Sequence, residues 1–241
     1  MNLLLYLIIL TYFLIGGVII LYINGKHVSK YNKQIWLKYF TFFIIVNLLF
    51  ASVMFNPLYF HYLSIIIISV SSLEIIRLTY ITGKINTGVV SLLFFTLFSF
   101  TFLQFSLLDK QLLIIVIFTV FIFDGFSQLT GQIAGKTKIL PQISPNKTIE
   151  GLIGGYLFSI ISSVLIFNLL NMEFKQSLYF GFSISTFAFL GDLSASYIKR
   201  KFGVKDYSRL LPGMGGFLDK FDSLIFSGSF IYIIKTYSNI L

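Results

Sequence analysis

The feature that most limits how this chain can fold is a succession of long apolar runs separated by short polar segments. The hydrocarbon core of a bilayer is about 30 Å thick, so a helix needs about 20 predominantly apolar residues to cross it. Only 11% of the residues are charged, whereas about a quarter are charged in a typical soluble domain. We therefore predict an all-α, polytopic integral membrane protein. Its transmembrane helices, about eight in all, are expected near residues 2–23, 38–55, 59–80, 88–108, 112–131, 150–170, 177–198 and 221–239.

The apolar runs follow one another without an internal repeat or a disordered linker. The first run has no small-residue cleavage site after it and is longer than the apolar core of a signal peptide, so we expect it to be retained as a membrane span. These features indicate a single membrane domain over residues 1–241.

The composition excludes several kinds of chemistry. The chain has no cysteine, which rules out disulfides, thiolate catalysis and cysteine-ligated zinc. Its two histidines, His27 and His61, are expected to be loop or interface residues rather than members of a metal cluster or a catalytic triad. The net charge of +9 is typical of cytoplasmic loops in membrane proteins, so no nucleic-acid partner is expected.

Basic residues are concentrated in alternate loops. The first, third, fifth and seventh loops hold 15 of the 18 Lys and Arg residues. These are Lys26, Lys30, Lys33, Lys38, Arg77, Lys84, Lys136, Lys138, Lys147, Lys199, Arg200, Lys201, Lys205, Arg209 and Lys220. Because such loops stay on the cytoplasmic side, we predict a cell-membrane protein with both termini outside and loops five and seven in the cytoplasm.

Four of the nine acidic residues, Asp124, Asp192, Asp219 and Asp222, interrupt or border apolar runs. A carboxylate at the centre of a bilayer costs about 2.5–3.5 kcal/mol on insertion scales, so such residues are rare and usually functional. The alternative is that they are interfacial residues or pair with neighbouring lysines. The predicted topology sets all four beside basic cytoplasmic loops, which is the combination that Mg²⁺ and a polyphosphate require.

Two stretches carry a recognisable motif. The second of them, residues 191–222, reads GDLSASYIKRKFGVKDYSRLLPGMGGFLDKFD, and the first, residues 124–155, reads DGFSQLTGQIAGKTKILPQISPNKTIEGLIGG. Their spacing resembles that of the phosphatidate cytidylyltransferase (CDP-diacylglycerol synthase) family. The matching positions are Ser144, Pro145, Lys147, Thr148, Ser196, Lys199, Arg200, Lys205, Asp206, Pro212, Gly213, Gly215, Gly216, Asp219 and Asp222. The resemblance makes residues 111–241 the catalytic region and covers residues 1–110 only as hydrophobic spans.

This resemblance implies transfer of CMP from CTP to phosphatidate with release of pyrophosphate, as a step of phospholipid synthesis. It implies Mg²⁺ as cofactor, with a second cation such as K⁺ left open. The implied metal ligands are Asp192, Asp219 and Asp222, with Asp124 as a weaker candidate. The other implied catalytic residues are Lys199, Arg200 and Lys205. The implied substrate-binding residues are Ser144, Lys147, Thr148, Ser196, Asp206, Gly213, Gly215, Gly216 and Lys220.

Plainer explanations stand beside these roles. The basic residues are also typical of any cytoplasmic loop near anionic lipid. Ser144 and Thr148 can each cap the start of the sixth span. The glycines suit close contacts between membrane helices. Glu74, in the third span, is expected to pair with Arg77 three residues on.

Two positions depart from the family motif. Met214 stands where the motif has histidine, and Lys220 stands where it has arginine. Methionine neither carries a proton nor suits a hard cation, and lysine lacks the bidentate fork of arginine. The same reaction on another lipid phosphate and an inactive family member are therefore kept as alternatives. An ion transporter is a further alternative, because carboxylates within a membrane also mark ion pathways. Homodimer formation, acyl-chain preference and use of dCTP are left open.

Overall fold

The computed structural model describes residues 2–25, 31–169 and 173–237, and eight α-helices make up most of this part of the chain. They are α1 (Asn2–Gly25), α2 (Tyr31–Phe55), α3 (Pro57–Thr82), α4 (Ile85–Phe105), α5 (Lys110–Ala134), α6 (Ile149–Leu169), α7 (Phe174–Phe202) and α8 (Leu218–Tyr237). Each predicted span overlaps one of these helices, so the all-α prediction is confirmed. His27, Lys26 and Lys30 lie outside the described residues.

Seven of the described helices, α1 to α7, are long and apolar enough to cross a membrane. The chain is thus a multi-pass membrane protein. The eighth predicted span corresponds to α8, which carries Asp219, Lys220, Asp222 and Lys235. Most of α8 is buried against other helices instead of facing outward. Its charges are therefore sheltered by protein, which is where ionisable residues at membrane depth are usually found.

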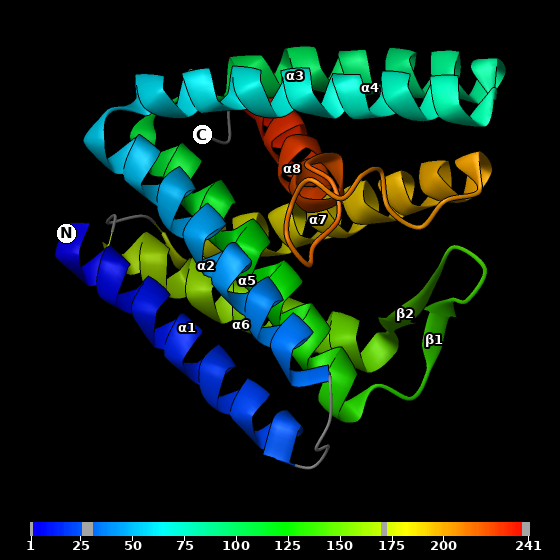
Figure 1. Cartoon of the computed structure of the whole chain (residues 1–241). Helices are drawn as coiled ribbons and strands as arrows, with labels where there is room; N and C mark the ends of the chain where they lie inside the picture. Colours follow the sequence, from blue (N-terminus) through cyan, green and yellow to red (C-terminus); the bar gives the residue numbers. More distant parts are fainter. Residues whose placement is uncertain (1, 26–30, 170–172, 238–241) are drawn as a thin grey trace.

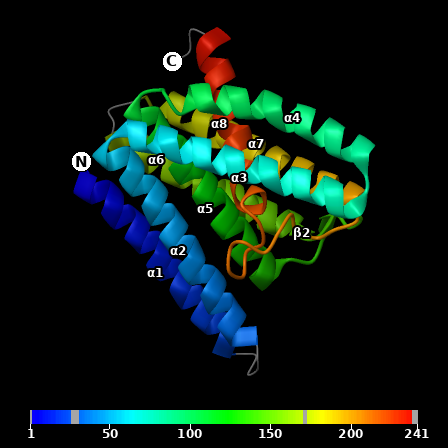
Figure 2. The same cartoon turned by 45° about the horizontal axis from the view of Figure 1, so that its top comes forward.

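The helices form layers around a central helix. In Figure 1, α3 and α4 lie side by side along the top and α1 runs next to α2, while α5, α6 and α7 occupy the middle. Figure 2 shows α8 between the α3–α4 layer and α7, and α8 contacts both α4 and α7. Large apolar side chains of α1 to α4 remain exposed on the outside, as expected for surfaces that face lipid.

Helix α5 is the centre of the core. Every residue from 112 to 123 is buried, and α5 contacts α1, α2, α6, α7 and α8. A helix that is hydrophobic all round is found in the core of a large protein or across a membrane, and α5 is enclosed by other helices. The enclosed part of α5 ends one residue before Asp124, so this carboxylate lies next to the core.

A short antiparallel hairpin, which the sequence did not predict, joins α5 to α6. Its strands are β1 (Lys138–Leu140) and β2 (Ser144–Thr148), with Lys138 opposite Thr148. Thr148 ends β2, and its Oγ1 accepts the Gly151 N–H at 3.1 Å, which caps the start of α6 as predicted. The same prediction was wrong for Ser144, which lies in β2 four residues before Thr148.

The segment between α7 and α8, residues 203–217, is a loop that begins with Gly203 at the end of α7 and contains two further glycines of positive φ. Gly213 and Gly215 have φ angles of 74° and 96°, a region that residues with a side chain rarely adopt. Leu211 N–H donates to the Gly215 carbonyl at 2.8 Å, which closes the turn. This loop is called the signature loop below because it carries six of the motif residues, Lys205, Asp206, Pro212, Gly213, Gly215 and Gly216.

Candidate active site

The motif residues of the hairpin and of α7 meet in an ion pair. Lys147 Nζ of β2 lies 2.8 Å from Asp192 Oδ2 of α7. The same ammonium lies 5.0 Å from the centre of the Phe189 ring. One turn along α7, Ser196 Oγ donates to Asp192 Oδ1 at 3.3 Å. Three of the predicted site residues, Lys147, Asp192 and Ser196, are therefore brought together.

A second, more deeply buried pair joins α7 to α8. Lys199 Nζ lies 2.6 Å from Asp219 Oδ1, and the Asp219 side chain is only 4% exposed. Its other oxygen, Oδ2, accepts the N–H groups of Tyr207 at 2.7 Å and Gly216 at 2.8 Å. Asp219 thus holds the signature loop against α7 through Lys199 and two backbone N–H groups.

Glycine is required where the loop passes Asp219. A Cβ atom on Gly215 would lie 2.9 Å from Asp219 Oδ2 and 3.3 Å from the Asp206 side chain. With its positive φ as well, position 215 leaves no room for a larger residue. Gly215 was predicted to let the backbone approach a ligand closely. In this structure it lets the backbone approach the Asp219 carboxylate.

Asp222 and Asp124 form the innermost part of the site. Ser223 connects them, because its N–H donates to Asp222 Oδ1 at 2.7 Å and its Oγ to Asp124 Oδ1 at 3.2 Å. Asp222 Oδ2 is buried and has no hydrogen-bond partner. Both carboxylates lie close enough to Asp192 to repel it electrostatically. A buried carboxylate oxygen without a partner is costly unless a ligand satisfies it.

These carboxylates fit a divalent cation. Hard oxygen ligands are what Mg²⁺ prefers, and Mg²⁺ is usually held by one or two carboxylates together with substrate phosphates and water. Within the described part of the chain, no three acidic or histidine side chains form a complete metal cage. Asp222 with Asp192 or Asp124 would therefore supply part of the coordination, and a phosphate group would supply the rest.

Lys220 is buried next to this group in an aromatic setting. Its ammonium lies 4.2 Å from the centre of the Phe42 ring of α2 and 5.2 Å from that of Phe121 of α5. An ammonium over aromatic faces is attracted by the negative face of each ring. In place of the motif's arginine, the chain thus has a lysine whose position is set by two phenylalanines.

An apolar recess lies against Asp222 on the side of α4. It is lined by Phe94 and Phe98 of α4, Ile198 of α7 and Phe226 of α8, with Asp222 as its only charged wall residue. The recess has a volume of about 40 Å³, and its apolar wall ends next to the carboxylate cluster.

Other predicted residues lie apart from the carboxylates. Arg200 donates from Nε to the Ile143 carbonyl and from Nη1 to the Val204 carbonyl, both at 3.0 Å. It therefore ties the hairpin to the end of α7. Lys205 and Asp206 are exposed on the signature loop, and Ser144 is half-buried in β2.

The tip of the signature loop contacts α2. Thr41 Oγ1 donates to the Pro212 carbonyl at 3.1 Å, and a Cβ on Gly213 would lie 3.1 Å from Lys38 Cγ. Met214 is half-buried and packs against the hydrophobic core. The residue that replaces the motif's histidine is therefore an apolar contact of the loop.

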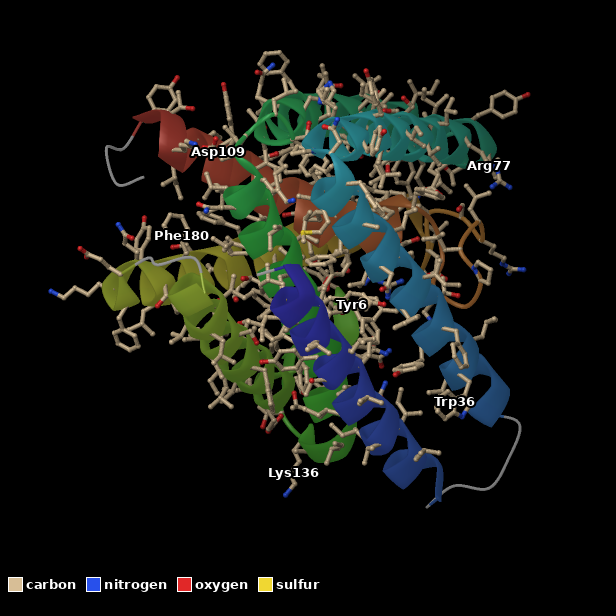
Figure 3. The ribbon with its side chains drawn as sticks, turned by 90° about the vertical axis from the view of Figure 1, so that its left-hand side faces the viewer. Tyr6, Trp36, Arg77, Asp109, Lys136 and Phe180 are labelled. Carbon is tan, nitrogen blue, oxygen red and sulfur yellow. The ribbon has the colours of Figure 1, made fainter. Side chains whose placement is uncertain are left out.

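The prediction that Glu74 pairs with Arg77 was wrong. Arg77 is exposed, and Figure 3 shows it at the end of α3 with its guanidinium pointing away. Glu74 is 3% exposed and accepts hydrogen bonds from the Ser208 hydroxyl and from the N–H groups of Phe217 and Leu218. Sequence reasoning missed this role because the spacing of 3 within one helix suggested a local partner.

His61 forms a hydrogen bond with Ser106 Oγ at 2.7 Å, which agrees with its predicted structural role.

Comparison with known proteins gives matches in the part of the chain that carries this site. Residues 87–238 match a sequence model described as the cytidylyltransferase family. The chain is 47% identical over 109 residues to the phosphatidate cytidylyltransferase of Staphylococcus haemolyticus, which is 44% of this chain and 42% of that protein. It is 40% identical over 123 residues to that of Aquifex aeolicus, covering 50% of this chain and 46% of the relative.

The uncharacterized protein YnbB of Escherichia coli is 46% identical over 109 residues, covering 44% of this chain and 37% of that relative. The chain thus spans less than half the length of these curated relatives. The matched family segment begins at residue 87 and contains α5 to α8, whereas α1, α2 and α3 precede it.

Proposed function

The chain belongs to the cytidylyltransferase family, and on that premise we propose that it transfers CMP from CTP to phosphatidate, giving CDP-diacylglycerol and pyrophosphate. The observation that carries this proposal is the buried, unpartnered oxygen of Asp222 beside Asp192 and Asp124. The names of two relatives, both phosphatidate cytidylyltransferases, agree with it. The same reaction on another lipid phosphate is the second candidate, favoured by Met214 and Lys220 at two motif positions.

In the proposed reaction a phosphate oxygen of the lipid attacks the α-phosphorus of CTP. A new P–O bond forms there, the bond from the α-phosphorus to the bridging oxygen breaks, and pyrophosphate leaves with the electron pair. A phosphate monoester has a second pKa near 6, so it is largely dianionic at neutral pH. The nucleophile needs no general base, which makes an active enzyme compatible with methionine at position 214.

The residues of this chain would lower the repulsion between the two anions. Lys147, Lys199 and Lys220 surround the carboxylates with positive charge that can turn to phosphate oxygens. Asp222, with Asp192 or Asp124, would supply part of the coordination of Mg²⁺, which when bound supplies positive charge at the phosphate oxygens. A second cation such as K⁺ would have to draw on Asp219, which Lys199 and two backbone N–H groups occupy here.

The first expected result is that purified protein incorporates radiolabelled CMP from CTP into phosphatidate only with a divalent cation, releasing one pyrophosphate per lipid product. The measurement is lipid-extracted label and pyrophosphate, with and without EDTA. A panel of other lipid phosphates identifies the preferred acceptor, and better use of one of them would favour the second candidate. Folded protein that labels no lipid phosphate with Mg²⁺ or Mn²⁺ would contradict both candidates.

We also propose that the site faces the cytoplasm and that both termini lie outside. In Figure 1 the hairpin lies on the right and α1 begins on the left, and Figure 3 shows Asp109 and Arg77 at opposite ends of the α3–α4 pair. The basic residues of the hairpin and the signature loop then follow the positive-inside rule.

Single cysteines test this orientation, since the chain has none of its own. Gln142→Cys and Arg209→Cys are exposed positions and are expected to react with a membrane-impermeant maleimide only after the cells are opened. Asp109→Cys, in the α4–α5 connection, is the matched control and is expected to react in intact cells. Ser208 is unsuitable because it is only 7% exposed. Labelling of position 142 or 209 from outside would overturn the topology.

A further inference from the structure

Glu74 holds the start of α8 from a helix that lies outside the matched family segment. Its Oε1 accepts the Phe217 N–H and its Oε2 the Leu218 N–H, both at 2.9 Å. Ser208 Oγ donates to Oε1 at 2.5 Å. The carboxylate is buried, so three donors from the signature loop and α8 replace the water that it would otherwise bind.

The chemistry at this position calls for a carboxylate. The first N–H groups of a helix have no partner inside the helix, and the positive end of the helix dipole favours negative charge there. The site also has its shape set by glycine, because a Cβ on Gly216 would lie 2.6 Å from Glu74 Oε1. Gly216 was predicted to let the backbone approach a ligand, and in this structure the Glu74 carboxylate lies against it.

Asp219 and Glu74 between them accept three consecutive backbone N–H groups. Gly216 N–H donates to Asp219, and the next two N–H groups, of Phe217 and Leu218, donate to Glu74. Asp219 in turn holds Lys199 and the Tyr207 N–H. The two carboxylates therefore fix the end of the loop where α8 begins. This point, Leu218, is one residue before Asp219 and four residues before Asp222.

We propose that Glu74 is a positioning residue for the reaction. It sets the direction in which α8 begins, and with it the places of Asp219 and Asp222 relative to α5 and α7. This inference rests on the proposed function, because it assigns Glu74 a part in placing the groups that would bind the metal and phosphates. Through Glu74, the N-terminal helices take part in a site built by the matched segment.

The test compares Glu74→Gln with Arg77→Gln on the same helix. Glutamine keeps the size of the side chain but points an NH₂ group at backbone donors. Hydrogen exchange measured without substrate or metal is expected to rise in residues 207–218 of Glu74→Gln and to stay unchanged in α5 and α6. In the turnover assay the Mg²⁺ concentration for half-maximal rate is expected to rise about tenfold, equal to about 1.4 kcal/mol. Arg77→Gln is expected to match the wild type in both.

A purely structural role would lower the amount of folded protein without moving the Mg²⁺ concentration for half-maximal rate. If Glu74→Gln fails to fold, Ser208→Ala removes one donor and is expected to shift both readouts in the same direction by a smaller amount. Wild-type exchange in residues 207–218 of either folded variant, or an unchanged Mg²⁺ requirement, overturns the inference. Inactive but folded wild-type protein would instead count against the proposed function, and the exchange measurement would still decide whether Glu74 holds the loop.

Discussion

Replacing Asp222 by asparagine is expected to lower turnover at least about a thousandfold, or about 4 kcal/mol of transition-state stabilisation, while the protein stays folded. Asp222 Oδ2 is buried without a partner, so its negative charge is available to a metal rather than committed to the fold. The substitution also removes repulsion with Asp192 and Asp124. We therefore expect the midpoint of thermal unfolding in EDTA to equal or exceed that of the wild type.

Turnover, thermal unfolding in detergent and Mg²⁺-dependent stabilisation are measured together for this variant. Asp109→Asn is the matched control, because the 76% exposed Asp109 side chain pairs only with Lys235 at the far end of the molecule. The Lys235 charge and hydrogen bond lower the pKa of Asp109, but its loss leaves the carboxylate cluster intact. If Asp222→Asn retained more than about a tenth of wild-type turnover, Asp222 would not be a metal ligand in the reaction.

Asp219→Asn is expected to abolish turnover as well, but with loss of stability. In either orientation the new NH₂ group faces the Lys199 ammonium or the N–H groups of Tyr207 and Gly216. Breaking a buried ion pair by removing one partner costs about 3–5 kcal/mol, because the other charge stays buried. The midpoint of thermal unfolding should therefore fall, and hydrogen exchange in residues 203–217 should rise.

The Asp222→Asn and Asp219→Asn variants are thus distinguished by their stability, since both are expected to lose turnover. A control for Asp219 is the double replacement Lys199→Met with Asp219→Asn, which removes both charges and keeps an oxygen for the two N–H groups. It should restore part of the stability without restoring turnover. An Asp219→Asn variant that is as stable as the wild type would show that the Lys199 pair does not hold the loop.

The helices were predictable because each long apolar run has few alternatives in a bilayer. All eight predicted spans correspond to helices, and α5, with its unbroken apolar stretch, is the most enclosed of them. The hairpin was not predictable in the same way. Its five-residue strand β2 contains Pro145 and Asn146. It lacks the alternation of apolar and polar residues that indicates a strand in a sequence.

The site was partly predictable. Motif spacing picked out Lys147, Asp192, Ser196, Lys199 and Asp219, which the structure brings into contact. It said nothing of whether each contact is made with a ligand or with the protein. Arg200 donates to backbone carbonyls, and Asp219 accepts backbone N–H groups.

Sequence alone determined that this chain is a multi-pass helical membrane protein, and it predicted which carboxylates and lysines belong to its site. Both conclusions depend on local properties: the length of apolar runs and the spacing of charged residues. Only the tertiary structure decided which charges are committed to the fold and which remain free. Glu74 meets Leu218 of α8 across 144 residues of sequence, and Lys220 meets Phe42 of α2. Such contacts follow from how the helices are arranged, a property that no local pattern encodes.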